Sequence, residues 1–175
     1  MQQTTSAQRT VVVVPSQADW PDAFAKERTE ILQALGEIVC ELHHIGSTAV
    51  PGLAAKPILD LLLEVTDLKE LDAKTQMLLA LGYHAKGENG IPGRRYFYKG
   101  DSSRTHHLHA FVVNAPLARQ HLLFRDFLRT NPAAASQYAT LKLALASQFP
   151  EDNARYQAGK DALIVQLLHH AAQYS

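Results

Sequence analysis

The chain has 175 residues, 46% of them hydrophobic, which is the size and composition of one folded domain with a sizeable core. Its 17 lysines and arginines balance 17 acidic residues, which excludes a strongly basic nucleic-acid-coating protein and an acidic disordered chain. No apolar run approaches the roughly 20 residues that span a bilayer, and the polar start does not resemble a signal peptide. We therefore expect a cytoplasmic protein with a disordered leader (residues 1–10) and one domain (residues 11–175).

The first third of the chain predicts a strand, a helix and a second strand. The β-branched residues 11–14 are typical of a short edge strand. Asp19 is a candidate N-cap for a helix that ends at Gly36. Residues 38–45 predict a strand, in which Cys40 is expected to be a small buried hydrophobe.

The rest of the chain changes from alternating to helical patterns. The nearly continuous apolar run over residues 57–65 predicts a buried strand, and Thr66 or Asp67 can cap the helix that follows. That helix is expected over residues 68–81. Further strands are expected over residues 83–86, 95–99 and 106–113, and further helices over residues 117–129, 133–149 and 153–172. This order predicts an α+β fold, a mixed sheet with packed helices and an α-helical C-terminal part.

Alternation along two strands places polar side chains on one sheet face. Asp60 and Glu64 share a face of their strand, and His107 and His109 share a face of theirs. Imidazole together with carboxylate suits a divalent transition ion, while carboxylates alone suit magnesium. The same pattern also arises from half-buried histidines that bind no metal. The residues of the two strands alone slightly favour this structural role over a metal site. Glu64, near its strand end, is expected to be solvated.

A Gly46-Ser47 pair follows the strand expected over residues 38–45. Such a turn offers free backbone N–H groups and a hydroxyl, which together cradle an anion. With Asp60 following in a hydrophobic strand, the pattern predicts a phosphate on the turn and a metal on the carboxylate. The basic candidates are Lys56, Arg94, Arg95, Lys99, Arg125, Lys142 and Lys160. The predicted phosphate-binding set is Gly46, Ser47, Lys56, Arg95 and Lys142. One of His43 and His44 is expected to be a satisfied core histidine.

Residues 44–60 read HIGSTAVPGLAAKPILD, and this run resembles the signature of the GrpB family, whose domain also occurs fused to some bacterial dephospho-CoA kinases. The resemblance continues through Trp20-Pro21, Arg95-Tyr96-Phe97 and the histidines of residues 106–109, and it covers residues 11–165. It implies a nucleotidyltransferase-like fold, in which a Gly-Ser turn binds nucleotide phosphates. In that superfamily an Asp-x-Asp strand and a third carboxylate bind two magnesium ions.

Only some of the phosphate- and metal-binding residues of that superfamily have a match in this chain. Gly46 and Ser47 match the turn, and Asp60 matches the first carboxylate, which makes it the predicted catalytic residue. The second carboxylate is replaced by Leu62, and histidines stand where the third is expected. The resulting predicted metal set is Asp60, His107 and His109. One aspartate with two histidines suits a single ion, manganese or zinc, or no metal.

Two functions of different classes follow from these residues. The first is a nucleotidyltransferase or a nucleotide- or phosphometabolite-binding protein, with a nucleoside triphosphate as substrate and magnesium, manganese or zinc as cofactor. The alternative is a catalytically inactive binding or regulatory module with the same fold and a protein partner. A metal-dependent phosphoesterase is weaker because too few ligands are present, and the zero net charge disfavours nucleic acid.

Overall fold

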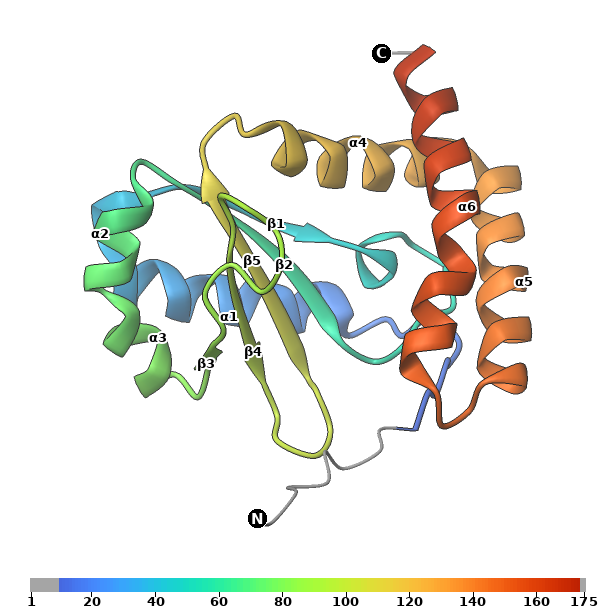
Figure 1. Ribbon diagram of the computed structural model, residues 1–175, viewed down its shortest axis with the longest axis horizontal. Helices are drawn as coiled ribbons and strands as arrows, with labels where there is room; N and C mark the ends of the chain where they lie inside the picture. Colours follow the sequence, from blue (N-terminus) through green and yellow to red (C-terminus); the bar gives the residue numbers. More distant parts are fainter. Residues whose placement is uncertain (1–9, 174–175) are drawn as a thin grey trace.

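The computed structural model describes residues 10–173, so the expected leader lies outside the described residues except for Thr10. Within this range a five-stranded mixed sheet is accompanied by six α-helices, as expected for the mixed fold (Figure 1). The strands are β1 (Val39–Ile45), β2 (Leu59–Val65), β3 (His84–Ala85), β4 (Arg95–Lys99) and β5 (His106–Val112). The helices are α1 (Trp20–Leu35), α2 (Leu68–Ala73), α3 (Thr75–Ala80), α4 (Pro116–Thr130), α5 (Pro132–Gln148) and α6 (Asn153–Gln173), with short 3₁₀ turns η1 (Gly36–Ile38) and η2 (Ser47–Ala49). No helix within the described range is long and apolar enough to cross a membrane.

The strand order is β1-β2-β5-β4-β3, with β2 and β5 parallel and the other neighbours antiparallel. The β2–β5 register sets Asp60 beside His107 and Leu62 beside His109. Because paired residues in adjacent strands project from the same face, Asp60 and His107 point the same way. The expected common face of these two strands is confirmed.

Helices α1 and α3 cover the opposite, leucine-rich face. Leu61, Leu63 and Leu108 are fully buried there in one cluster with Ile31 and Leu35 of α1. Full burial of a leucine side chain contributes about 1.5–3 kcal/mol. The core therefore fixes the orientation of β2 and β5, and with it the direction in which Asp60 and the histidines point.

The polar face is divided between a closed half and an open half. Leu62 is completely buried with Phe111 of β5 and Ala118 of α4. Asp60 and His107 line a cleft instead, and α5 and α6 stand as a pair on its far side (Figure 1). The position at which the resemblance places a second carboxylate is thus part of an apolar core under α4.

Two N-terminal expectations were wrong. Residues 11–14 form no strand; Val14 makes an isolated bridge to Ala55, and the N–H of Val11 donates to the carbonyl of Pro150 at 2.7 Å. One bridge to the loop before β2 and one hydrogen bond to the C-terminal half therefore take the place of a regular strand. Asp19 makes no side-chain cap because its backbone is helical (φ −87°, ψ −9°), whereas a capping side chain needs an extended backbone.

Two further expectations were corrected in the middle of the chain. The helix expected over residues 68–81 is interrupted at Lys74, whose Nζ instead donates to the last carbonyl of α1, that of Leu35, at 2.6 Å. The expected cap by Asp67 is confirmed, since its carboxylate accepts from the N–H of Lys69 at 2.8 Å. Cys40 is exposed rather than buried, because β1 is an edge strand and its register shifts at this residue.

Candidate phosphate-binding cleft

The Gly46-Ser47 turn connects the end of β1 to η2 directly above Asp60. Gly46 has φ 69° and ψ −169°, a backbone conformation that residues with a side chain rarely adopt. A Cβ on Gly46 would lie 2.6 Å from Oδ2 of Asp60. Only glycine therefore lets the turn and the carboxylate approach this closely, and the two form one floor of the cleft.

Asp60 is held by the histidines of β5. Nδ1 of His107 lies 3.1 Å from Oδ1 of Asp60, and Nε2 of His109 lies 3.9 Å from the same oxygen. Burial by itself would raise the pKa of Asp60, but the hydrogen bond from His107 and the nearby imidazole of His109 outweigh burial and hold this pKa below its usual value. Asp60 is consequently an ionised carboxylate that accepts a hydrogen bond from His107 and is a weak base.

The donor set around Asp60 does not fit a divalent cation. An ionised carboxylate only accepts hydrogen bonds, so Nδ1 of His107 carries a hydrogen. The guanidinium of Arg94 lies 3.4 Å from Nδ1 of His109, which places the hydrogen of a neutral His109 on Nε2, the nitrogen that faces Asp60. Nitrogens that carry hydrogen have no lone pair for a metal. In agreement, the described residues contain no group of three or more His, Cys, Asp or Glu arranged as metal ligands.

Lysines form the wall opposite the carboxylate. Nζ of Lys142, on α5, donates to Oγ of Ser47 at 2.8 Å and to the carbonyl of Ala54. Nζ of Lys160, on α6, lies 4.7 Å from the ring centroid of Tyr156. Lys56, in the loop before β2, donates to Oδ1 of Asn153 at 3.2 Å. The long C-terminal helices thus carry two cations back to a turn about 100 residues earlier in the chain.

These ammonium groups are crowded and poorly hydrated. Burial, reinforced by the charges of Lys160 and Lys56, lowers the pKa of Lys142 to about 7 against a counteracting effect of Asp60. Burial and the charge of Lys56 likewise lower the pKa of Lys160 to about 8. Buried cations that repel one another are stabilised by an anion, so the wall is prepared for a negatively charged ligand.

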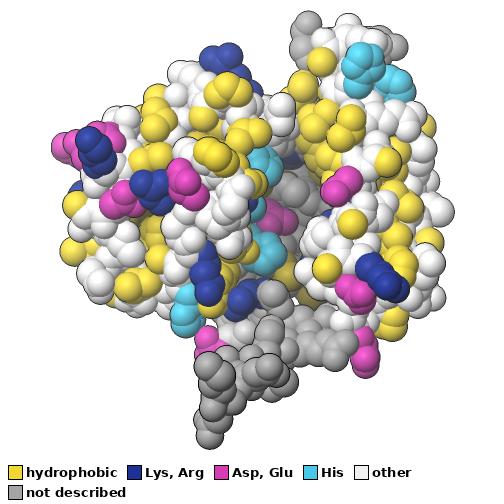
Figure 2. All heavy atoms as spheres, in the orientation of Figure 1, with side chains coloured by type: hydrophobic (Ala, Val, Ile, Leu, Met, Phe, Trp, Pro, Cys, Tyr) yellow, Lys and Arg dark blue, Asp and Glu magenta, His cyan; other side chains and the backbone are white. Residues whose placement is uncertain are grey.

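Turn, carboxylate and lysines surround one cleft of about 1020 Å³. Figure 2 shows it as a groove between two lobes, with histidine side chains gathered in its depth. The cleft brings together Gly46, Ser47, Lys56, Asp60, His107, His109 and Lys142, all of which were predicted from the sequence. Sequence reasoning left Lys160 among its weaker candidates, although it lies one helical turn after Tyr156 and so shares its face.

Arg95 is the predicted site residue that the structure does not bring to this cleft. Its guanidinium pairs with the carboxylate of Asp72 in α2 at 2.7 and 2.8 Å. Its neighbour Arg94 lines the cleft and donates to the carbonyls of Glu88 and Asn89. The sequence contained a signal that excludes Arg95 from the cleft. Side chains alternate between the two faces of β4, so Arg95 shares the face of the core residue Phe97.

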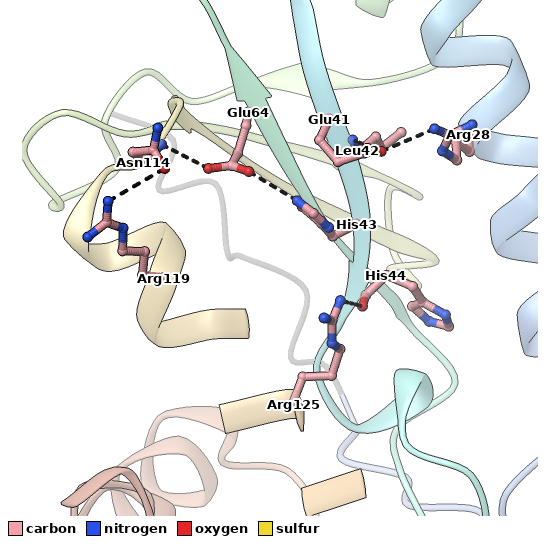
Figure 3. A network of polar contacts seen from close by, with 9 residues as sticks. All are labelled: Arg28, Glu41, Leu42, His43, His44, Glu64, Asn114, Arg119 and Arg125. Atoms are coloured by element: carbon pink, nitrogen blue, oxygen red, sulfur yellow. Dashed lines mark hydrogen bonds and ion pairs between the residues drawn. The ribbon is translucent and has the colours of Figure 1, made fainter. Parts of the chain in front are cut away.

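Glu64 is buried rather than solvated, which corrects the expectation for it. Its two carboxylate oxygens accept from Nε2 of His43 and from the N–H of Asn114, each at 3.0 Å (Figure 3). The carboxylate therefore ties β1 to the start of the loop before α4. The expectation that one of His43 and His44 is a core histidine is confirmed for His44. This residue is buried, with Nε2 2.8 Å from Oγ1 of Thr48.

Two arginines of α4 brace the turn from behind. Nη1 of Arg125 donates to the carbonyl of His44 at 3.2 Å (Figure 3), and Nε of Arg129 donates to the carbonyl of Ala49 at 2.9 Å. These carbonyls lie on either side of Gly46 and Ser47. The turn is consequently held at both ends by one helix, which keeps its N–H groups and hydroxyl in place.

The buried His44 and the half-buried His121 of α4 make the fold sensitive to acid. Burial lowers the pKa of His44 to about 4 and that of His121 to about 4, from 6.5. The unfolded chain then binds more protons than the folded one below pH 6.5, so stability falls as the pH drops from about 6.5 to 4. We expect a loss on the order of 3 kcal/mol for each histidine, measured by urea unfolding at a series of pH values. A His121→Phe variant should lose less, and an equal acid loss in this variant would contradict the assignment.

Solved structures with a similar fold define the class of this architecture. Terminal uridylyl transferase 4 from Trypanosoma brucei, solved with bound dUTP, matches with a TM-score of 0.57 at 10% identity, over 91% of this chain and 55% of that one. The Cid1 poly(U) polymerase, solved with Mg 3′-dATP bound, matches with a TM-score of 0.53 at 18% identity, over 78% of this chain and 44% of that one. The protein therefore has a nucleotidyltransferase-like fold.

Closer relatives identify the family. The family model for the GrpB protein matches residues 10–170, and the chain belongs to the GrpB family. A crystal structure of a conserved GrpB protein from Enterococcus faecalis superimposes with a TM-score of 0.89 at 39% identity, over 93% of this chain and 98% of that one. The UPF0157 protein YqkA of Bacillus subtilis is 43% identical over 89% of this chain, which spans only 46% of that protein. A dephospho-CoA kinase of Mycobacterium tuberculosis is 27% identical over 93% of this chain and 46% of its own length.

Proposed function

We propose that this protein binds a nucleotide or a related phosphorylated metabolite in the cleft, through the phosphate groups. The observation that carries the proposal is the charge of the lining. Among the described residues, five lysines and arginines line the cleft together with a single carboxylate, that of Asp60, in a chain whose net charge is zero. The cations are Lys56, Arg94, Arg104, Lys142 and Lys160. A concentration of one sign of charge in a cleft attracts a ligand of the opposite sign.

The aromatic lining supports a ligand that carries more than phosphate. Tyr96, Phe124, Tyr138 and Tyr156 line the same cleft. Aromatic rings offer a surface on which a nucleobase stacks, with about 1–3 kcal/mol per base. A volume of about 1020 Å³ is ample for a ligand of nucleotide size.

Binding is favoured over two-metal nucleotidyl transfer. Transfer by two metals needs several oxygen ligands, but Leu62 closes the position of the second carboxylate and Asp60 is occupied by histidine donors. The low pKa of Asp60 also makes it a weak general base for an acceptor hydroxyl. These features favour a protein that retains the phosphate site of its fold class without the metal pair.

A thermal-shift screen tests the proposed function. We expect ATP, UTP and inorganic tripolyphosphate to raise the melting temperature, because a ligand at 100 times its Kd adds about 2.7 kcal/mol to stability. Adenosine, which has no phosphate, is the matched control and should give little shift. A shift with adenosine as large as with ATP would contradict recognition through phosphate. Phosphate or pyrophosphate released from ATP at a rate that falls in Asp60→Asn would show that the protein is an enzyme.

A further inference from the structure

We infer that the cleft takes its ligand as a bare polyphosphate chain, without a divalent cation, and that lysine and arginine side chains neutralise it in place of the metal. This inference rests on the proposed function and names the ionic form of the ligand. It separates the protein from the Cid1 polymerase of the same fold class, which was solved with a magnesium nucleotide.

The first argument is the hydrogen content of the nitrogens around Asp60. His107 donates to Oδ1 of Asp60 at 3.1 Å, and Arg94 at 3.4 Å occupies the nitrogen of His109 that faces away from the carboxylate. Arg94 is itself anchored by two backbone carbonyls and is buried, so its guanidinium stays in place. A cation beside Asp60 would have to displace hydrogens from both rings and approach a fixed positive charge.

The second argument is the sign of the whole cleft. Five cationic side chains face one carboxylate in the lining, which leaves a large positive excess. Like charges repel one another, and this repulsion is stronger where the protein partly excludes water. A further dication adds to this repulsion, whereas a triphosphate with about four negative charges removes it.

The third argument is the position of the lysines relative to the turn. Lys142 contacts Oγ of Ser47, the group that the Gly-Ser turn offers to a phosphate. Lys160 is held in the same cleft near the ring of Tyr156. A phosphate on the turn would therefore lie within reach of an ammonium group that neutralises its charge.

Calorimetric titration with tripolyphosphate and ATP, in EDTA and in excess MgCl₂, tests the inference. We expect binding in EDTA and an affinity at least several-fold weaker in magnesium, because the cation removes two charges from the ligand. Binding that requires magnesium, or that is tenfold tighter with it, would overturn the inference while leaving the proposed function intact. No binding of either probe in either buffer would overturn both.

Two further arms keep the metal question separate from the ligand. Titration with Mn²⁺ alone, followed by electron paramagnetic resonance, should reveal no Mn²⁺ site that depends on Asp60. The wild type and Asp60→Asn should therefore bind the same amount of Mn²⁺. In EDTA, Asp60→Asn should bind tripolyphosphate several-fold tighter than the wild type, because the amide has the shape of the carboxylate and lacks its negative charge. A Mn²⁺ site that depends on Asp60, or a tenfold loss of tripolyphosphate affinity in the folded variant, would overturn the inference.

Discussion

Replacing Lys142 by methionine is expected to weaken binding of tripolyphosphate by 10- to 100-fold. The ammonium group is buried beside Ser47 at the turn, where its hydrogen bond to an anionic oxygen is worth about 1.5–3 kcal/mol. Methionine has a similar length and fits an apolar environment, so the variant is expected to fold. Lys69→Met is the matched control, because Lys69 is an exposed lysine on α2 outside the cleft.

The same substitution should change how stability depends on pH. The folded-state pKa values of Lys142 and Lys160, about 7 and about 8, lie below the ordinary lysine value of 10.5. Between pH 7 and 10 the unfolded chain therefore holds protons that the folded protein has released, and stability rises with pH. Each lysine contributes at most about 1.4 kcal/mol per pH unit to this rise.

Urea unfolding at pH 7, 8, 9 and 9.5 measures the effect. The wild type should become more stable across the series, and Lys142→Met should gain clearly less. At pH 7 the two proteins should differ by about 1 kcal/mol or less, because relief of a buried charge offsets the lost hydrogen bonds to Ser47 and Ala54. Identical slopes for both proteins would show that Lys142 keeps an ordinary pKa, and unchanged tripolyphosphate binding would remove it from the site.

Gly46→Ala is expected to have the second large effect, a loss of about 2–4 kcal/mol of stability together with loss of binding. The backbone at Gly46 has positive φ, and the new Cβ would lie 2.6 Å from Oδ2 of Asp60. Either the turn or the carboxylate must move. Because both form the cleft floor, binding of tripolyphosphate should weaken at least tenfold in the protein that remains folded.

Gly52→Ala separates backbone strain from the clash. Gly52 also has positive φ, at 77°, but a Cβ there would meet nothing within 4 Å. We expect this variant to lose about 1–2 kcal/mol and to bind tripolyphosphate normally. The free energies of unfolding and the Kd values of the two variants are compared by urea titration and calorimetry. Equal losses in both would show that the Asp60 contact is unimportant.

Much of the fold could be predicted because the strong patterns are local. The nearly continuous apolar run over residues 57–65 and the pattern of residues 106–113 predict both central strands. Alternation along them predicts the common face of Asp60 and His107, as the register confirms. The strand expected at residues 11–14 failed because its outcome depends on distant partners, Ala55 and Pro150. Local propensity carries no information about such long-range contacts.

The site was harder to predict than the fold, for the same reason. The turn at Gly46 and Ser47 follows from a short motif, but its cationic partners come from α5 and α6. Whether Arg94 or Arg95 enters the cleft depends on the face of β4 from which each side chain projects. Arg95 shares the face of the core residue Phe97 and pairs with Asp72 instead. The burial of Glu64 likewise depends on His43 and Asn114, which a pattern within one strand does not include.

A crystal structure of the protein grown with ATP and MgCl₂ tests the central claim most directly. The account predicts phosphate groups in contact with Ser47, Lys142 and Lys160, and no cation coordinated by Asp60. A magnesium ion at about 2.1 Å from a carboxylate oxygen of Asp60, bridging to the phosphates, would contradict it. Phosphates bound away from the Gly46-Ser47 turn would contradict it equally.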